Sequence, residues 1–127
     1  MNEATPPLLH ELEAEIMEEV WATGEATVHT VRDALNARSE RQRAYTTVMT
    51  VMSRLSSKGL LEKERRGRSD RYIATMSRAE YMDARAGLEV DTLVAEYGDV
   101  ALAHFAARVA QLDPGRRRKL RRLAQRD

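Results

Sequence analysis

The chain has 127 residues, 43% of them hydrophobic and 32% charged, which favours one folded domain or one small domain with an accessory part. It contains no cysteine, and this excludes disulfides, thiol nucleophiles and thiolate metal sites. No apolar run approaches the ~18 residues of a membrane span and no N-terminal signal pattern is present, so we expect a soluble cytoplasmic protein without membrane insertion.

The net charge of +1 conceals a sorting of charges along the chain. Residues 1–40 hold nine acidic and two basic side chains, whereas residues 41–75 hold nine basic and three acidic ones. Residues 76–112 are acidic again, and residues 113–127 hold seven basic and two acidic side chains. Such blocks are typical of a chain that presents one surface to a polyanion.

Two amphipathic helices are predicted in the first 40 residues. The first has apolar residues three to four positions apart and ends at Gly24. Those apolar residues are Leu9, Leu12, Ile16 and Val20. Because its other face is rich in glutamate, we expect this helix on the side of the domain away from any phosphate. The second helix runs from Val28 to Ala37 with Thr27 as its N-cap, and a polar turn over residues 38–43 follows.

The segment from Ala44 to Leu61 (AYTTVMTVMSRLSSKGLL) is predicted as a third helix with two different faces. Its apolar face is formed by Val48, Val51, Met52 and Leu55, and its polar face by Thr46, Thr47, Thr50, Ser53, Arg54 and Ser57. Gly59 is expected as the left-handed residue that ends the helix. A face of hydroxyls and one guanidinium, with no carboxylate, suits phosphates and base edges. The alternative is an exposed face that is merely rich in threonine.

A basic β-hairpin is predicted directly after this helix. Residues 60–66 and 71–74 have strand patterns, and residues 67–70 are turn formers. Five arginines lie on or near the hairpin: Arg65, Arg66, Arg68, Arg71 and Arg78. Helix, short helix, turn, helix and basic hairpin together predict a winged helix-turn-helix that binds DNA. The alternative is a solvated edge hairpin whose arginines prevent edge pairing.

Three more helices are predicted. The first runs over residues 78–97 and is opened by a Ser77–Glu80 capping box, and Gly98-Asp99 ends it. The second carries Leu102, Phe105, Val109 and Leu112, and the last runs to about Gln125 with Asp113 as its N-cap and Pro114 in its first position. Three such helices are too small to bury their apolar faces alone, so we expect them to pair with the same helices of a second chain. The fold class is therefore mainly α with a small β-hairpin. We expect a winged-helix DNA-binding domain over residues 1–76 and a three-helix dimerisation region over residues 77–127.

These residues resemble the penicillinase-repressor (BlaI/MecI-type) family of winged-helix regulators. The resemblance is carried by Leu9–Trp21 (LHELEAEIMEEVW), Thr27–Leu35 (TVHTVRDAL), Ala44–Leu61 and Gly67–Ala74 (GRSDRYIA). It implies a homodimeric transcriptional repressor that binds inverted-repeat operators in double-stranded DNA, ahead of resistance or stress genes. By position, it places Tyr45, Thr46, Thr47, Thr50 and Arg54 at the major groove, with Arg68 in the wing.

Within this carried-over set, Arg54 is the best candidate for a bidentate contact with guanine. Four residues are better suited to clamp phosphates, namely Arg43, Tyr45, Lys58 and Arg65. The family also implies release by a membrane sensor protease that triggers cleavage at an Asn-Phe bond in the dimerisation helices. The matching dipeptide here is His104-Phe105, and Phe105 fits equally as part of the apolar stripe. Because the chain lacks the cysteines of the copper-responsive branch, thiolate copper sensing is excluded.

Rival functions find less support in the sequence. The three histidines, His10, His29 and His104, have no spacing that forms a metal site or a catalytic pair, and no glycine-rich phosphate loop is present, so we expect no enzyme and no cofactor. A winged helix that binds proteins and a regulator induced directly by a small molecule remain alternatives. For the basic C-terminal helix we expect a solvated face, with contacts to flanking phosphates or to the acidic first helix as alternatives.

Overall fold

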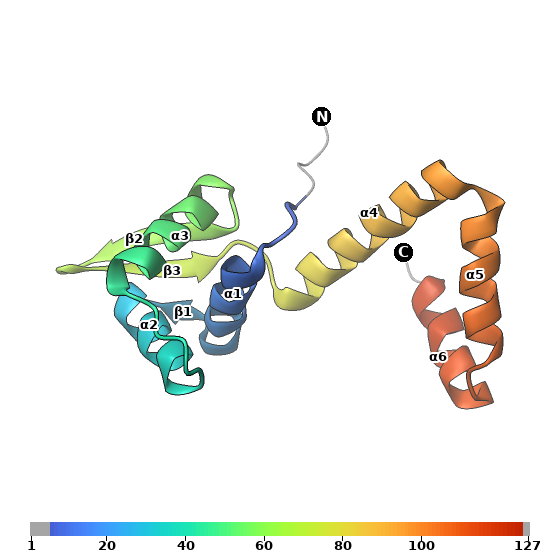
Figure 1. Ribbon diagram of the computed structural model, residues 1–127, viewed down its shortest axis with the longest axis horizontal. Coiled ribbons are helices and arrows are strands. Elements are labelled where there is room, and N and C mark those ends of the chain that lie inside the picture. Colours follow the sequence, from blue (N-terminus) through green and yellow to red (C-terminus); the bar gives the residue numbers. More distant parts are fainter. Residues whose placement is uncertain (1–5, 126–127) are drawn as a thin grey trace. The chain divides into compact units, whose positions relative to one another are not determined.

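The computed structural model describes residues 6–125, which form two compact units (Figure 1). The first unit extends to Ala86 and the second begins at Gly87, so the boundary falls inside one helix. Residues 1–5 and 126–127, the outer ends of the two expected domains, lie outside the described residues. The expected functional division between residues 76 and 77 stays a prediction.

The first unit contains three helices and a three-stranded antiparallel sheet, followed by the start of a fourth helix. The elements are α1 (Glu11–Thr23), β1 (Glu25–Ala26), α2 (Val28–Ala37), α3 (Tyr45–Ser57), β2 (Leu61–Arg66), β3 (Ser69–Ala74) and α4 (Arg78–Tyr97). Strand β3 lies between β1 and β2. This helix and strand order is the winged helix-turn-helix that the sequence predicts, and the fold class is confirmed.

The core of this unit joins all three helices to the sheet. From α3 it takes the four residues predicted to face inward, each at most 7% exposed: Val48, Val51, Met52 and Leu55. Ile16, Met17 and Val20 of α1 and Tyr72 of β3 belong to the same cluster. Gly59 has φ +86°, which confirms it as the left-handed residue after α3. The core buries the apolar face of α3, and the opposite face of the helix stays exposed to solvent.

Two features of the sheet differ from the sequence-based expectation. Strand β1 was not predicted, because two residues are too short to show alternation; its Ala26 pairs with Tyr72 of β3. The hairpin turn is also shorter than expected. Only Gly67 and Arg68 lie between the strands, since Ser69 already pairs with Arg66. Gly67 has φ +60°, the conformation that a tight two-residue hairpin turn requires at its first position.

The start of α4 is attached to the first unit by polar contacts. The Tyr81 hydroxyl donates to the Pro7 carbonyl at 2.5 Å, and the Trp21 indole N–H donates to the Met76 carbonyl at 3.0 Å. The rings of Trp21 and Tyr81 lie 5.5 Å apart. Burial raises the pKa of Tyr81, so its hydroxyl stays a donor well into the alkaline range. The first turns of α4 therefore belong to the winged-helix unit.

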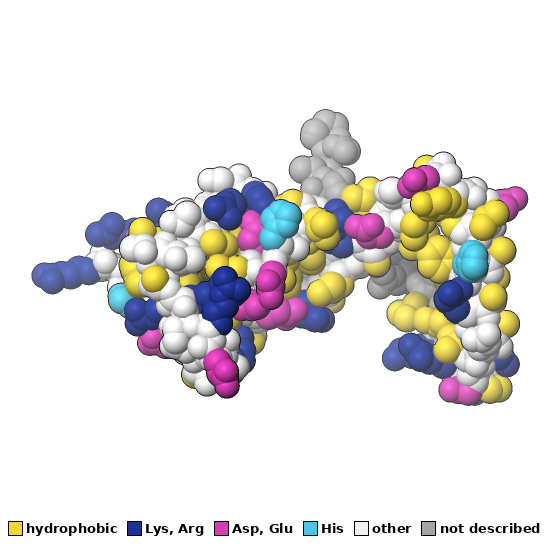
Figure 2. Space-filling view, in the orientation of Figure 1, with side chains coloured by type: hydrophobic (Ala, Val, Ile, Leu, Met, Phe, Trp, Pro, Cys, Tyr) yellow, Lys and Arg dark blue, Asp and Glu magenta, His cyan; other side chains and the backbone are white. Residues whose placement is uncertain are grey.

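The second unit consists of the rest of α4 with α5 (Asp99–Ala110) and α6 (Pro114–Ala124). In α5 and α6 the structure buries one side chain, Ala101, and large apolar residues stay at the surface (Figure 2). Those at least 36% exposed are Leu88, Val90, Leu93, Tyr97, Val100, Leu102, Phe105, Val109 and Leu123. Within residues 6–125 no helix is long and apolar enough to cross a membrane. Such a large exposed apolar set in one small unit is typical of an interaction surface.

Candidate nucleic-acid interface

The outward face of α3 presents short polar side chains and one guanidinium to solvent. Thr46, Thr47, Thr50, Ser53 and Arg54 are all exposed, and α3 contains no acidic residue. Arg54 lies in the last turn of α3, where a basic side chain can bond the free carbonyl groups of the helix end. Among residues 6–125, however, its guanidinium has no hydrogen-bond or ion-pair partner. The face predicted from the helical period is therefore present and is not used by the fold.

The loop that leads into α3 is held by one side chain of α2. Asn36 donates from Nδ2 to the Arg43 carbonyl at 3.1 Å and accepts the Arg43 N–H on Oδ1 at 2.8 Å. Gln42 donates to the Asn36 and Ser39 carbonyls at 3.1 and 2.9 Å. Both backbone groups of Arg43 are thus bonded, and its half-exposed side chain emerges from a defined position just before α3. A preset loop lowers the ordering cost of a contact made there.

A groove of about 280 Å³ lies between α2, α3 and the hairpin. The rings of His29 and Tyr45 form one side, with centroids 4.5 Å apart and planes tilted by 38°. Met49 and Ser53 of α3, and Lys63 and Arg68 of the hairpin, are among its other lining residues. The groove therefore combines aromatic, apolar and cationic side chains, together with the carboxylate of Asp70, beside the exposed face of α3.

The hairpin carries a partly paired set of cations (Figure 2). Arg65 donates from Nε to the Gly67 carbonyl at 3.1 Å and approaches Asp70 at 3.8 Å. Arg66 pairs with Glu25 and Glu64 at 3.3 and 3.2 Å. Arg68, in the turn itself, is exposed and has no ion-pair or hydrogen-bond partner in the described part of the chain. Arg68 is therefore the cation of the wing that is freest to reach a phosphate.

Lys58, the remaining residue assigned to DNA from the sequence, lies apart from this face. Its ammonium group sits 2.7 Å from Oε2 of Glu13 in α1, and its side chain is 30% exposed. The Glu13 side chain is 2% exposed. Burial raises the pKa of Glu13, but the hydrogen bonds from the His10 N–H and from Lys58 outweigh it and hold that pKa below its usual range. Lys58 therefore already has an anionic partner inside the protein.

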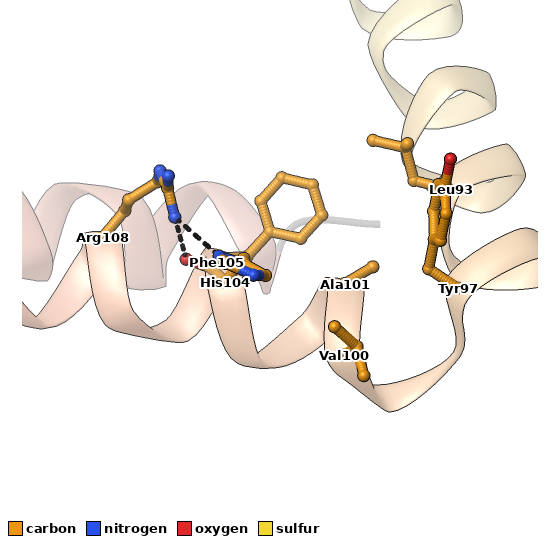
Figure 3. A pocket seen from close by; sticks show the side chains of 7 residues that line it. All are labelled: Leu93, Tyr97, Val100, Ala101, His104, Phe105 and Arg108. Carbon is orange, nitrogen blue, oxygen red and sulfur yellow. Dashed lines mark hydrogen bonds between the residues drawn. The ribbon is translucent and has the colours of Figure 1, made fainter.

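The two residues proposed for cleavage, His104 and Phe105, lie in the middle of α5 in the second unit. Phe105 points into an apolar cavity of about 340 Å³, which Leu93 and Tyr97 of α4 also line (Figure 3). Arg108 donates to the His104 carbonyl at 3.0 Å, and one of its N–H groups lies 3.3 Å from the His104 ring. Phe105 thus belongs to the exposed apolar face, as its stripe position predicts.

Sequence reasoning missed two residues of the groove. The sequence gives His29 no role beyond excluding it from a metal site or a catalytic pair, and only the fold brings its ring against Tyr45. Met49 was assigned to neither face of its helix, yet it is 39% exposed among threonines and serines. The signal that could have indicated exposure of Met49 was its position between the apolar and polar faces of the helix. Within the described residues no group of histidine and acidic side chains forms a metal site.

Known proteins resemble this chain along most of its length. Residues 9–126 match the profile of the penicillinase repressor family. A transcriptional regulator BlaI from Mycobacterium tuberculosis is 42% identical over 106 residues, which cover 80% of this chain and 73% of the relative. The solution structure of the DNA-binding domain of the repressor BlaI shares the fold, with a TM-score of 0.52 and 24% identity over 63% of this chain and 94% of that one. A monomeric BlaI of Bacillus licheniformis, in complex with the blaP half-operator, has a TM-score of 0.50 and 25% identity over 60% of this chain and 90% of its own.

Proposed function

The chain belongs to the penicillinase repressor family, a family of regulators and not of enzymes, and from this premise we propose that it represses transcription by binding an inverted-repeat DNA operator as a homodimer. The observation that carries the proposal is the acid-free outer face of α3, which the core leaves unused, beside a hairpin with an unpaired arginine. A fold that used its winged helix only to bind proteins would not require that pattern.

In this proposal α3 enters the major groove, which is about 12 Å wide and admits one helix with its side chains. Arg54 makes a bidentate contact with guanine, because its planar fork matches the two acceptors on that base edge. Thr46, Thr47 and Thr50 contact base edges and phosphates through their hydroxyls. Met49 supplies an apolar contact that suits the methyl group of thymine.

Phosphate contacts set the register of the helix without reading sequence. We assign them to Arg43 and Tyr45 at the start of α3, and to Arg65 and Arg68 of the wing. His29 contacts the Tyr45 ring in a tilted arrangement and is proposed to support it at the edge of the groove. Lys58 is assigned instead to the fold, since Glu13 occupies its ammonium group.

The second unit is proposed as the dimerisation region. Its exposed residues Leu93, Val100, Phe105 and Val109 form an apolar surface that one chain leaves in water. A second copy would cover this apolar surface, and a twofold dimer matches the symmetry of an inverted repeat. The 340 Å³ cavity lies within this surface, so dimerisation fills it.

Release from DNA is proposed to follow a signal that disrupts this surface, and a membrane sensor protease that triggers cleavage at His104-Phe105 is one such signal. The bond lies inside a regular helix, so α5 must unwind before a protease reaches it. A second candidate is a small apolar inducer in the 340 Å³ cavity, whose size falls within the range of ligand sites. A compound that separates the dimer without cutting the chain would favour the second candidate.

Selection of duplexes from a random pool at two salt concentrations tests the proposed function. We expect a palindromic site to be enriched, with affinity falling steeply as salt rises. The Arg54→Gln protein serves as the matched control, since it keeps the fold and loses one proposed base contact. Retention of DNA without enrichment of any site would refute sequence-specific repression, and absence of salt-dependent binding would refute DNA binding.

A further inference from the structure

We propose that α6 is a second DNA-binding element, which contacts phosphates independently of sequence. The inference rests on the proposed function only in taking DNA as the polyanion. It concerns α6, which lies outside the winged-helix unit. The proposed reading of the operator by α3 and the wing gives α6 no role.

Cations dominate the composition of α6. Six of its eleven residues are basic and none is acidic. They are Arg116, Arg117, Arg118, Lys119, Arg121 and Arg122. The helix is about 16 Å long, which corresponds to roughly five phosphates of one DNA strand at about 3.4 Å per charge along the axis. Its cations therefore have the density and reach to neutralise several phosphates at once.

The stability of the helix does not account for this arrangement. Arginines occupy the first turns, where the positive end of the helix dipole repels cations. Arg117 and Arg121, like Arg118 and Arg122, are four residues apart, and like charges at that spacing destabilise a helix. The Asp113 carboxylate caps the helix by accepting the Arg116 N–H at 2.9 Å. Repulsion among these cations therefore lowers the stability of α6, and a bound polyanion would relieve that repulsion.

Within the described part of the chain, the fold uses only one of these cations. Arg117 donates to the Ala110 carbonyl at 3.2 Å and to the Leu112 carbonyl, which holds the turn between α5 and α6. The other five have no ion pair and no side-chain hydrogen bond with any residue from 6 to 125. A solvated basic face normally includes acidic neighbours at helical spacing, and α6 has none. The unpaired cations are therefore available to an external anion.

DNA fits this helix better than an anionic membrane does. A helix that lies on a membrane needs a broad apolar face with leucines and aromatic residues. The apolar side of α6 offers Leu120, which is half-buried within its own unit, and Leu123. It carries no aromatic residue. The helix thus has the charge for a polyanion and lacks the apolar area for insertion.

The test uses the full chain and a variant with Arg118, Lys119, Arg121 and Arg122 changed to glutamine. Arg118 and Arg122 lie on the side of α6 opposite Leu120, Lys119 and Arg121 flank it, and the change spares Arg117. Affinity is measured against salt on the selected operator and on a scrambled duplex of equal length. We expect the slope of log affinity against log salt to become smaller by about 2 to 4 on both duplexes. The ratio of specific to non-specific affinity should stay unchanged, whereas Arg54→Gln should lower that ratio.

A second variant, with Arg118→Lys, Arg121→Lys and Arg122→Lys combined, keeps the charge and should retain the wild-type slope. Circular dichroism and molar mass show whether each variant keeps its helices and its assembly. An unchanged salt slope in the glutamine variant would refute the proposal. The proposal would likewise be refuted if that slope is unchanged and the wild type binds phosphatidylglycerol vesicles. If the wild type binds neither duplex, the proposed function fails; if it selects an operator and the glutamine slope is unchanged, only the role of α6 fails.

Discussion

Lys58, directly after α3, forms an ion pair with Glu13, which lies 45 residues earlier in α1. The Lys58 ammonium and Glu13 Oε2 are 2.7 Å apart, and Glu13 Oε1 accepts the backbone N–H of His10 at 3.0 Å. The buried carboxylate therefore has a partner for each oxygen. Because the pair joins the beginning of the unit to the end of the proposed recognition helix, it helps set how α3 lies on the core.

Lys58→Met should destabilise the first unit and leave DNA recognition nearly intact. Removing the ammonium leaves a buried carboxylate with one backbone hydrogen bond, which costs about 1–3 kcal/mol. Urea unfolding at neutral pH and fixed protein concentration measures this loss, with Lys58→Arg as the control that keeps the charge. If Lys58→Met instead unfolds like the wild type and reduces the salt slope of DNA binding, Lys58 contacts phosphate.

Glu13→Gln should weaken the dependence of stability on acid pH. The native pKa of Glu13 is lowered, so its ion pair stabilises the fold above the ordinary carboxyl pKa. This stabilisation is lost as pH falls from the ordinary pKa through the lowered native value. The free energy of unfolding, measured from pH 7 to pH 3, should therefore fall less steeply in Glu13→Gln than in the wild type. Parallel curves for the two proteins would show that the pair contributes nothing to acid unfolding.

Arg54→Lys should relax the choice of base at one position of each half-operator. Lysine keeps the positive charge but cannot form the two parallel hydrogen bonds that guanidinium makes with guanine. Discrimination at that position should fall by about 1–3 kcal/mol, while affinity for scrambled DNA changes little. Competition with operators changed one base pair at a time measures the effect. A uniform loss on every sequence would instead identify Arg54 as a phosphate contact.

Met49 should couple to a thymine methyl group. We expect replacement of one thymine per half-operator by deoxyuridine to weaken wild-type binding, by about 0.8 kcal/mol for one buried methyl. The same replacement should have no effect on Met49→Ala, because the apolar partner is gone. Met49→Leu, which conserves volume, should behave like the wild type. Equal losses in the wild type and in Met49→Ala would show that the methyl is read elsewhere.

Phe105→Ala should weaken the proposed dimer without unfolding the winged-helix unit. The aromatic ring is 38% exposed on one chain and lies in the surface proposed to face the second copy. Truncation of a well-packed aromatic at an interface costs about 2 kcal/mol or more, a shift of roughly 30-fold in the dimer dissociation constant. Sedimentation at several concentrations measures the shift, and Asp99→Asn in the same helix is the control. Unchanged dissociation would place Phe105 outside the interface.

Much of the fold could be predicted because its signals are local. The four buried residues of α3, the end of that helix at Gly59 and the Asp113 cap of α6 follow from helical period, backbone conformation and side-chain hydrogen bonds within four residues. The exposed hydroxyl face of α3 lies opposite its buried face. The helical period that predicts the buried face therefore predicts the hydroxyl face as well. Local rules suffice wherever both partners of an interaction lie within one element.

What required the tertiary structure depends on pairs of residues far apart in the chain. The sequence indicated Lys58 as a cation for DNA, and only packing of α1 against α3 places Glu13 beside it. Strand β1 exists only because β3 offers it an edge. The groove of His29, Tyr45 and Met49 forms only when α2 packs next to α3. Which helix faces are apolar, hydroxyl-bearing or basic follows from the sequence alone, because composition and helical period are local. Which charges are already paired follows only from the tertiary structure, because pairing depends on distance in space.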